Sequence, residues 1–173
     1  MAVWDTSVAS GLHPGSSLYE LASEAALADE PIRLAAPTVH EIGFGLQRRA
    51  ETDARFATLL RWFTGLLDAG VVEVLPLSWE AALLAGRLRA RQPTPPTGGR
   101  GSRKGRSRDP KPERRVAWVA DIQIAATAWL AGEDVCTADR EHFVALGDAI
   151  ADLFPDEDRL NIHPPPQLDA ADG

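Results

Sequence analysis

Four acidic residues that are far apart in the sequence share one kind of position, where a predicted strand ends or a predicted helix begins. They are Asp5 in V-W-D-T-S, Glu41 in T-V-H-E, Asp121 in V-A-D-I-Q-I-A-A and Asp139 in V-C-T-A-D. In an open parallel α/β sheet, ligands bind at the carboxyl ends of the strands. Four carboxylates that meet there form a pocket of hard oxygen ligands suited to Mg²⁺ or Mn²⁺. Such a pocket supports metal-assisted hydrolysis of phosphodiesters.

Each of these acids also has an ordinary structural explanation. Asp121 and Asp139 stand where a helix N-cap is predicted, and aspartate is a favoured N-cap residue. Thr38 and Glu41 have the spacing of a capping box, in which the glutamate side chain bonds back to the threonine backbone. Asp5 can simply begin a turn. The cap and metal-site interpretations are compatible, because a helix N-terminus stabilises negative charge.

The electrostatics of convergence favour a metal ion. Two carboxylates about 4 Å apart repel each other by roughly 4 kcal/mol at an effective dielectric constant of about 20. A divalent cation is the simplest compensation, so convergence of these side chains predicts a metal site. A zinc site is not predicted, because none of the four histidines has metal-ligand spacing with another histidine or with the single cysteine.

Predicted strands and helices alternate along the chain, which is typical of an α/β domain with a parallel sheet. Short strands are predicted at 3–4, 32–35, 71–75, 135–137 and 160–162. Helices are predicted at 17–28, 38–49, 53–70, 78–91 and 121–131, with a further short helix after 139. These elements would position the four acids.

Length and composition are those of a single domain with an apolar core. The chain has 173 residues, of which 45% are hydrophobic. No run approaches the roughly 20 apolar residues of a membrane span, and the N-terminus lacks the basic region of a signal peptide. The single cysteine, Cys136, excludes an internal disulfide and is expected to be a small buried residue on a strand. We therefore expect a cytoplasmic protein that does not associate with membranes.

The net charge of -7 is distributed unevenly. Residues 87–115 hold eleven of the eighteen Lys and Arg and two of the 25 acids, which leaves seven basic and 23 acidic residues elsewhere. Within this segment, residues 92–115 hold five Pro and four Gly and almost nothing apolar, which predicts a mobile basic insertion. The insertion is either a solvated loop, a contact for the acidic body or a partner, or an arm for RNA phosphates. The basic residues of such an arm are Arg100, Arg103, Lys104 and Arg106.

The four acids belong to motifs that occur in a fixed order. The motifs are D-T-S after the first strand, T-x-x-E about 36 residues later, D-x-x-I-A-A-x-A and then T-x-D-x-x-x-F. Together they resemble the PIN-domain ribonucleases, and most of all the VapC-like toxins of type II toxin–antitoxin pairs. The resemblance implies a PIN-like three-layer α/β sandwich with a short-stranded parallel sheet over residues 1–163, followed by a disordered tail at 164–173.

The resemblance also implies an activity and a set of site residues. Such proteins cleave RNA endonucleolytically with Mg²⁺ or Mn²⁺, often form homodimers, and are silenced by a small antitoxin whose tail enters the acidic pocket. Ser7 and Thr137 match the hydroxyl residues beside the first and last acids. The implied metal ligands are Asp5, Asp121 and Asp139, and Glu41 would bind metal or orient water. The implied catalytic residues are therefore Asp5, Glu41, Asp121 and Asp139.

Two other functions stay open at this point. One is a PIN-type nuclease that works in RNA processing or on DNA without an antitoxin, and a small antitoxin gene directly upstream would exclude it. The other is a domain that binds RNA or protein without cutting, although the presence of all four acids favours an enzyme. Two features depart from the family pattern: Trp4 stands where an aliphatic residue is usual, and the 92–115 segment is unusually long and basic.

Overall fold

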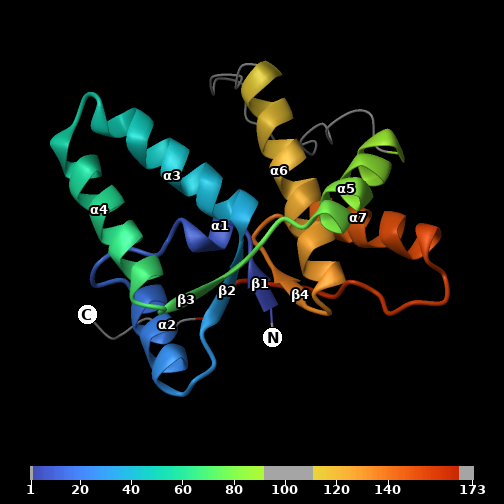
Figure 1. Ribbon diagram of the computed structural model, residues 1–173, viewed down its shortest axis with the longest axis horizontal. Helices are drawn as coiled ribbons and strands as arrows, with labels where there is room; N and C mark the ends of the chain where they lie inside the picture. Colours follow the sequence, from blue (N-terminus) through green and yellow to red (C-terminus); the bar gives the residue numbers. More distant parts are fainter. Residues whose placement is uncertain (1, 92–110, 168–173) are drawn as a thin grey trace.

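A five-stranded parallel sheet forms the centre of the protein (Figure 1). The structure is a computed structural model that describes residues 2–91 and 111–167, without the side chains of 111–115. The strands are β1 (Ala2–Trp4), β2 (Ile32–Ala35), β3 (Val72–Leu75), β4 (Asp134–Cys136) and β5 (Ile162–His163). Their order in the sheet is β3-β2-β1-β4-β5, so β1 lies between β2 and β4.

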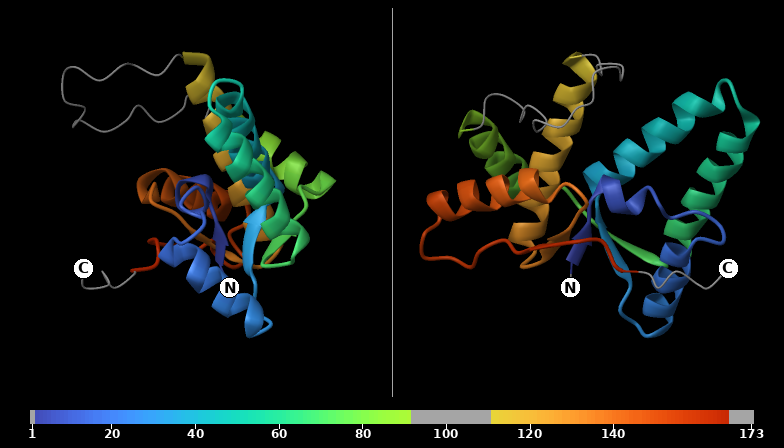
Figure 2. Two further views of the ribbon diagram at one scale, coloured as in Figure 1. Left: turned by 90° about the vertical axis from the view of Figure 1, so that its left-hand side faces the viewer. Right: turned by 180° about the vertical axis from the view of Figure 1, so that it is seen from behind.

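Helices connect the strands and cover both faces of the sheet. They are α1 (Thr6–Ala9), α2 (Ser17–Leu27), α3 (Ala36–Ala50), α4 (Ala54–Asp68), α5 (Trp79–Arg91), α6 (Lys111–Leu130) and α7 (Arg140–Leu153). Figure 1 shows α5, α6 and α7 to one side of the sheet and α2 and α4 to the other. Figure 2 shows the same arrangement from two further directions. None of the helices in the described ranges is long and apolar enough to cross a membrane.

The strands divide their side chains between two cores, because successive residues of a strand point to opposite faces of the sheet. In β1, Val3 belongs to the core under α5, α6 and α7, and Trp4 belongs to the core under α1, α2 and α4. In β4, Val135 and Cys136 divide in the same way. This alternation produces the predicted three-layer α/β sandwich.

The helix α6 is the central element of the first core. Its buried residues lie on almost every side of the helix, which is typical of a helix enclosed by other elements. They are Trp118, Ala120, Ile122, Ile124, Ala125, Ala126, Thr127 and Ala128. Because α6 packs against α5, α3, α7 and three strands, any side chain on it is placed with little freedom.

Several predicted element boundaries are wrong. The helix α3 begins at Ala36 with Pro37 in its first turn, a position that proline tolerates, so Pro37 does not close the preceding strand region. The helix α6 begins at Lys111, ten residues before Asp121, because Pro112 stands in its first turn and the following Glu and Arg residues favour helix. The helix α7 has 14 residues and is not short.

The start of α6 also shortens the predicted basic insertion, since residues 111–115 are helical. The rest of that prediction, including Arg100, Arg103, Lys104 and Arg106, lies outside the described residues. Residues 168–173 of the predicted tail lie outside them as well. Cys136 is buried on β4 as expected, and burial together with the nearby charge of Asp5 raises the pKa of its thiol to about 11.

Candidate active site

Asp5 lies at the carboxyl end of β1, in the middle of the sheet. It is 3% exposed and caps α1, whose Val8 amide donates to Oδ1 over 3.1 Å. The hydroxyl of Ser7 donates to the same oxygen over 2.7 Å, and that of Thr137 donates to Oδ2 over 2.8 Å. Burial raises the pKa of Asp5, although these three hydrogen bonds partly offset the effect. The aspartate is therefore both a helix cap and a buried, well-held carboxylate.

Thr137 and Ser7 join the loop after β4 to the loop after β1. Oγ1 of Thr137 donates to Asp5 and accepts from the backbone amide of Asp139 over 2.9 Å. Oγ of Ser7 donates to Asp5 and accepts from the amide of Ala138 over 2.9 Å. The two predicted hydroxyl residues thus connect the first and the last acid of the set.

Glu41 points toward α1 and does not form the predicted capping box. Its Oε2 accepts a 2.6 Å hydrogen bond from Oγ1 of Thr6, a residue that the sequence did not single out. Thr38 does not cap the helix, because α3 already begins at Ala36, and among the described residues Oγ1 of Thr38 has no hydrogen-bond partner. Burial is the main effect that raises the pKa of Glu41, and the charges of Asp121 and Asp5 raise it further.

Asp121 lies in the middle of α6, so the prediction that it caps a helix is wrong. Its side chain is 22% exposed, and Oδ2 lies 3.0 Å from Nδ1 of His142. The charge of Asp121 also contributes to the raised pKa of both Asp5 and Glu41. Three of the four predicted carboxylates therefore lie near enough to repel one another.

Asp139 lies at the margin of this group. It occupies the N-cap position of α7, as predicted, but its side chain makes no capping hydrogen bond. The side chain is 62% exposed, and its Oδ2 lies 4.0 Å from Nδ1 of His142. The structure thus places Asp139 beside the other acids through Thr137 and His142, with its carboxylate turned mostly to solvent.

His142 is the neighbour of the site that sequence reasoning missed. Its spacing from Asp139, three residues apart on a helix, was a usable signal, because such pairs lie on one face. Its contact with Asp121 was not readable, since the two residues belong to different helices.

The donor set suits a hard divalent cation in its chemistry. Carboxylate oxygens are the preferred protein ligands of Mg²⁺ and Mn²⁺. A cation would also relieve the repulsion that raises the pKa of Asp5 and Glu41. Within residues 2–91 and 111–167, however, no group of three or more His, Cys, Asp or Glu side chains is close enough to hold a metal ion. Binding therefore requires these carboxylates to draw closer together.

Two cavities lie outside the carboxylate cluster, and one of them borders it. The bordering cavity, of about 600 Å³, begins at Thr6 and Glu41 and runs between α3 and α4. Its apolar lining includes Ile42, Leu46, Phe56, Leu59, Trp62 and Phe63. We call it the α3–α4 groove.

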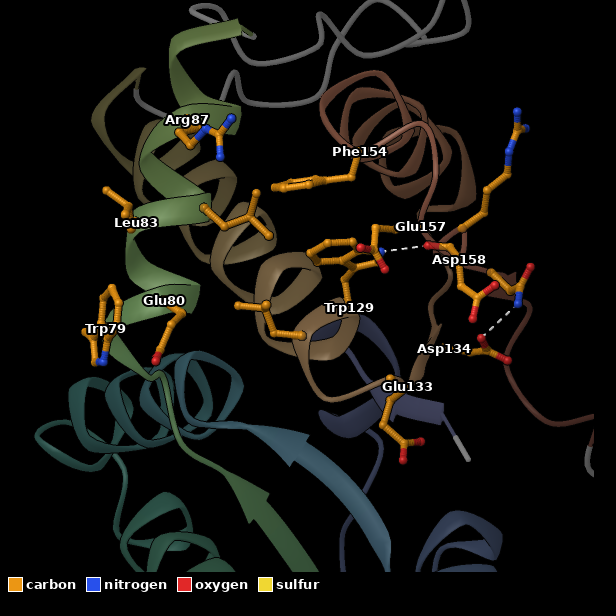
Figure 3. A pocket seen from close by; sticks show the side chains of 15 residues that line it. Trp79, Glu80, Leu83, Arg87, Trp129, Glu133, Asp134, Phe154, Glu157 and Asp158 are labelled. Atoms are coloured by element: carbon orange, nitrogen blue, oxygen red, sulfur yellow. Dashed lines mark hydrogen bonds between the residues drawn. The ribbon is translucent and has the colours of Figure 1, made fainter.

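The other cavity, of about 970 Å³, is the aromatic groove between α5, the end of α6 and residues 154–161 (Figure 3). Trp129 stacks on Phe154 with a centroid distance of 4.7 Å, and Arg87 lies over the Phe154 ring at 5.2 Å. The lining of this groove includes none of the four predicted acids. The larger of the two cavities is therefore not where the candidate chemistry lies.

Comparisons with known proteins agree with this architecture. Residues 2–148 match the PIN domain family. The chain is similar to FitAcB from Neisseria gonorrhoeae, at 22% identity and a TM-score of 0.57 over 94% of this chain and 96% of that one. It is similar to FitAB bound to an IR36 DNA fragment, at 23% identity and a TM-score of 0.56 over 95% of both chains.

A further likeness, to VapBC2 from Rickettsia felis bound to a DNA fragment from its promoter, has 17% identity and a TM-score of 0.49 over 94% of this chain and 97% of that one. No curated protein sequence matches. At these identities the solved structures speak for the fold, whereas the family match spans most of the chain. As the motifs predicted, this protein belongs to the PIN domain family.

Proposed function

We propose that this protein is a metal-dependent endoribonuclease that uses Mg²⁺ or Mn²⁺. The observation that carries the proposal is the mutual repulsion of Asp5, Glu41 and Asp121 at the carboxyl ends of the strands. Such an arrangement opposes folding unless a cation compensates it. Proteins of the PIN family are generally nucleases that use divalent metal ions, which supports the same chemistry.

In this proposal the acids have different tasks. Asp5, Asp121 and Asp139 would hold the cation, and Glu41 would hold it or orient the attacking water. When bound, the cation supplies a water of lowered pKa and polarises the scissile phosphate. Ser7 and Thr137 keep Asp5 in place, since both donate to its carboxylate.

The products distinguish this mechanism from attack by the RNA itself. Hydrolysis by water is expected to leave a 5′-phosphate and a 3′-hydroxyl, because the ribose 2′-hydroxyl takes no part. A 2′,3′-cyclic phosphate at the cut would contradict the proposal. End-labelling of the fragments with and without phosphatase treatment tells the two outcomes apart.

We further propose that the protein is the toxin of a toxin–antitoxin pair and that a small antitoxin protein binds it. The α3–α4 groove supports this, because it offers an apolar path that ends at Glu41. One similar structure, FitAB, is described as a complex with DNA. Co-expression with the product of a small upstream gene, followed by co-purification and loss of RNA cleavage, tests the pairing.

Two contacts with other molecules belong to the same proposal. A homodimer is supported by exposed apolar side chains beside the aromatic groove, with Trp79 74% and Leu83 61% exposed. Sedimentation of the wild type beside Leu83→Glu tests it. The basic residues Arg100, Arg103, Lys104 and Arg106 are proposed to bind RNA phosphates, so their replacement by Gln is expected to flatten the salt dependence of RNA affinity.

The central experiment is cleavage of labelled total RNA and of matched single-stranded DNA, with Mg²⁺, with Mn²⁺ and with EDTA. The control is the Asp5→Asn, Asp121→Asn double variant, which keeps side-chain size and removes both charges. Metal-dependent RNA cutting that the variant lacks supports the proposal, and cutting of DNA alone supports a DNA nuclease. If the protein binds RNA but neither form cuts it, the non-catalytic alternative holds.

A further inference from the structure

A buried histidine lies against one carboxylate of the candidate site. His142 is 5% exposed, and its Nδ1 lies 3.0 Å from Oδ2 of Asp121 but 4.0 Å from Oδ2 of Asp139. Only the shorter distance is within hydrogen-bond reach. Because a carboxylate only accepts hydrogen bonds, the hydrogen lies on Nδ1 of His142, which donates to Asp121.

The second ring nitrogen of His142 supports the same tautomer. Nε2 is buried and has no hydrogen-bond partner among the described residues. A buried N–H without a partner is unfavourable, so the arrangement favours a bare Nε2 and a hydrogen on Nδ1. The ring is also held by its surroundings, since its neighbours Phe143 and Leu146 on α7 are fully buried.

Asp121 depends on this one hydrogen bond more than Asp5 depends on any of its own. Asp5 accepts from Ser7, Val8 and Thr137, so both of its oxygens are held. The contact of Asp121 with His142 involves Oδ2 alone. Removal of His142 would therefore free the Asp121 side chain to rotate, whereas loss of one partner would leave Asp5 held by two others.

We propose that His142 is a positioning residue that holds Oδ2 of Asp121 and leaves Oδ1 for the divalent cation. This inference rests on the proposed function, because it concerns the same metal site. Hydrogen bonds to a metal ligand fix its orientation, and their loss typically weakens metal binding by 10- to 100-fold. His142 acts in this scheme through Asp121 and does not touch the metal or the RNA.

The test is Mn²⁺ binding to the full-length protein, measured by electron paramagnetic resonance of the free ion. His142→Leu removes the donor and keeps an apolar side chain, and we expect it to raise the Mn²⁺ dissociation constant by about 10-fold. His142→Asn retains an N–H near the position of Nδ1, and we expect it to restore affinity to within about threefold of wild type. Thermal unfolding of each variant checks that the fold is intact.

His163→Leu is the matched control. His163 also contacts an aspartate, with Nε2 2.7 Å from Oδ2 of Asp134, but Asp134 is not one of the four acids. We expect its Mn²⁺ affinity to equal that of wild type. A similar loss in His163→Leu and His142→Leu would overturn the inference, because the effect would not be specific to Asp121.

Asp5→Asn separates this inference from the proposed function. If wild type binds no Mn²⁺, or if Asp5→Asn binds it equally well, the metal site and the role of His142 are both overturned. If Asp5→Asn weakens binding but His142→Leu matches wild type or binds more tightly, only the positioning role is overturned. Equal losses in His142→Leu and His142→Asn would show that His142 acts through packing, which also overturns the positioning role.

Discussion

The carboxylate cluster and the aromatic groove show opposite consequences of burial. In the cluster, burial raises the pKa of Asp5 and of Glu41, so the ionised side chains oppose folding. In the aromatic groove, Trp129 stacks on Phe154 and its Nε1 donates to the carbonyl of Asp158 over 2.8 Å. Partly buried groups there have partners, so the groove stabilises the fold. The difference indicates that one region is arranged for binding and the other for stability, as is common where function and stability compete.

The largest expected effect separates activity from stability at Asp5. Asp5→Asn removes a proposed metal ligand, and we expect RNA cleavage to fall at least about 100-fold, since even indirect partners of a metal are worth 10- to 100-fold. The free energy of unfolding in metal-free buffer at neutral pH is expected to stay equal or rise, because a destabilising buried charge is gone. Single-turnover cleavage and urea unfolding measure the two quantities. A variant that cuts normally but unfolds easily would reverse the comparison.

Trp129→Ala should show the opposite pattern. Loss of the ring contact with Phe154 and of the hydrogen bond to Asp158 is expected to cost about 3 kcal/mol of unfolding free energy. Cleavage per folded molecule should be unchanged, because the groove includes none of the four acids. Trp79→Ala is the matched control, since its 74% exposed ring should change stability by no more than about 0.5 kcal/mol. Cleavage that falls together with stability would mean that the two regions are coupled.

Divalent metal should stabilise the protein through the carboxylate cluster alone. At a free Mn²⁺ concentration 100 times the dissociation constant, we expect about 2.7 kcal/mol of stabilisation and a rise in Tm of roughly 5–10 °C. Trp129→Ala should show the same rise from a lower starting Tm, and Asp5→Asn should show little. Differential scanning fluorimetry with and without EDTA makes the measurement. Ca²⁺ at equal ionic strength controls for general salt effects.

The smallest expected effect is a dependence of stability on pH. In the folded protein the pKa of Asp5 is raised from 3.8 and that of Glu41 from 4.5. The folded state therefore binds these protons more tightly, so their contribution to stability falls as pH rises from these ordinary values through the raised ones. Well below the ordinary values the contribution vanishes, because both states are protonated.

The Asp5→Asn, Glu41→Gln double variant isolates this dependence. Its free energy of unfolding without metal should exceed that of wild type by more at pH 7 than at pH 4, in urea titrations at constant ionic strength. A difference that shrinks as pH rises would show that the hydrogen bonds of Asp5 outweigh the effect of burial.

Much of the fold was readable from the sequence because its signals are local. The strand at 32–35 was predicted with the bounds that β2 has, from its apolar residues. The helix boundaries at Ala36 and Lys111 were missed because both helices hold a proline in their first turn, and a proline was taken as an interruption. Asp5 and Thr137 were identified as site residues from motifs, and the structure joins them by a hydrogen bond.

The sequence by itself determined the order of the elements, the alternation of apolar residues in the strands and the position of Asp5 directly after β1. The tertiary structure alone decided that Glu41 accepts from Thr6 instead of capping its own helix, and that His142 donates to Asp121. The reason is physical: caps and strand patterns depend on neighbours within a few residues. Contacts between α3 and α1, or between α7 and α6, depend on how the helices pack across the sheet.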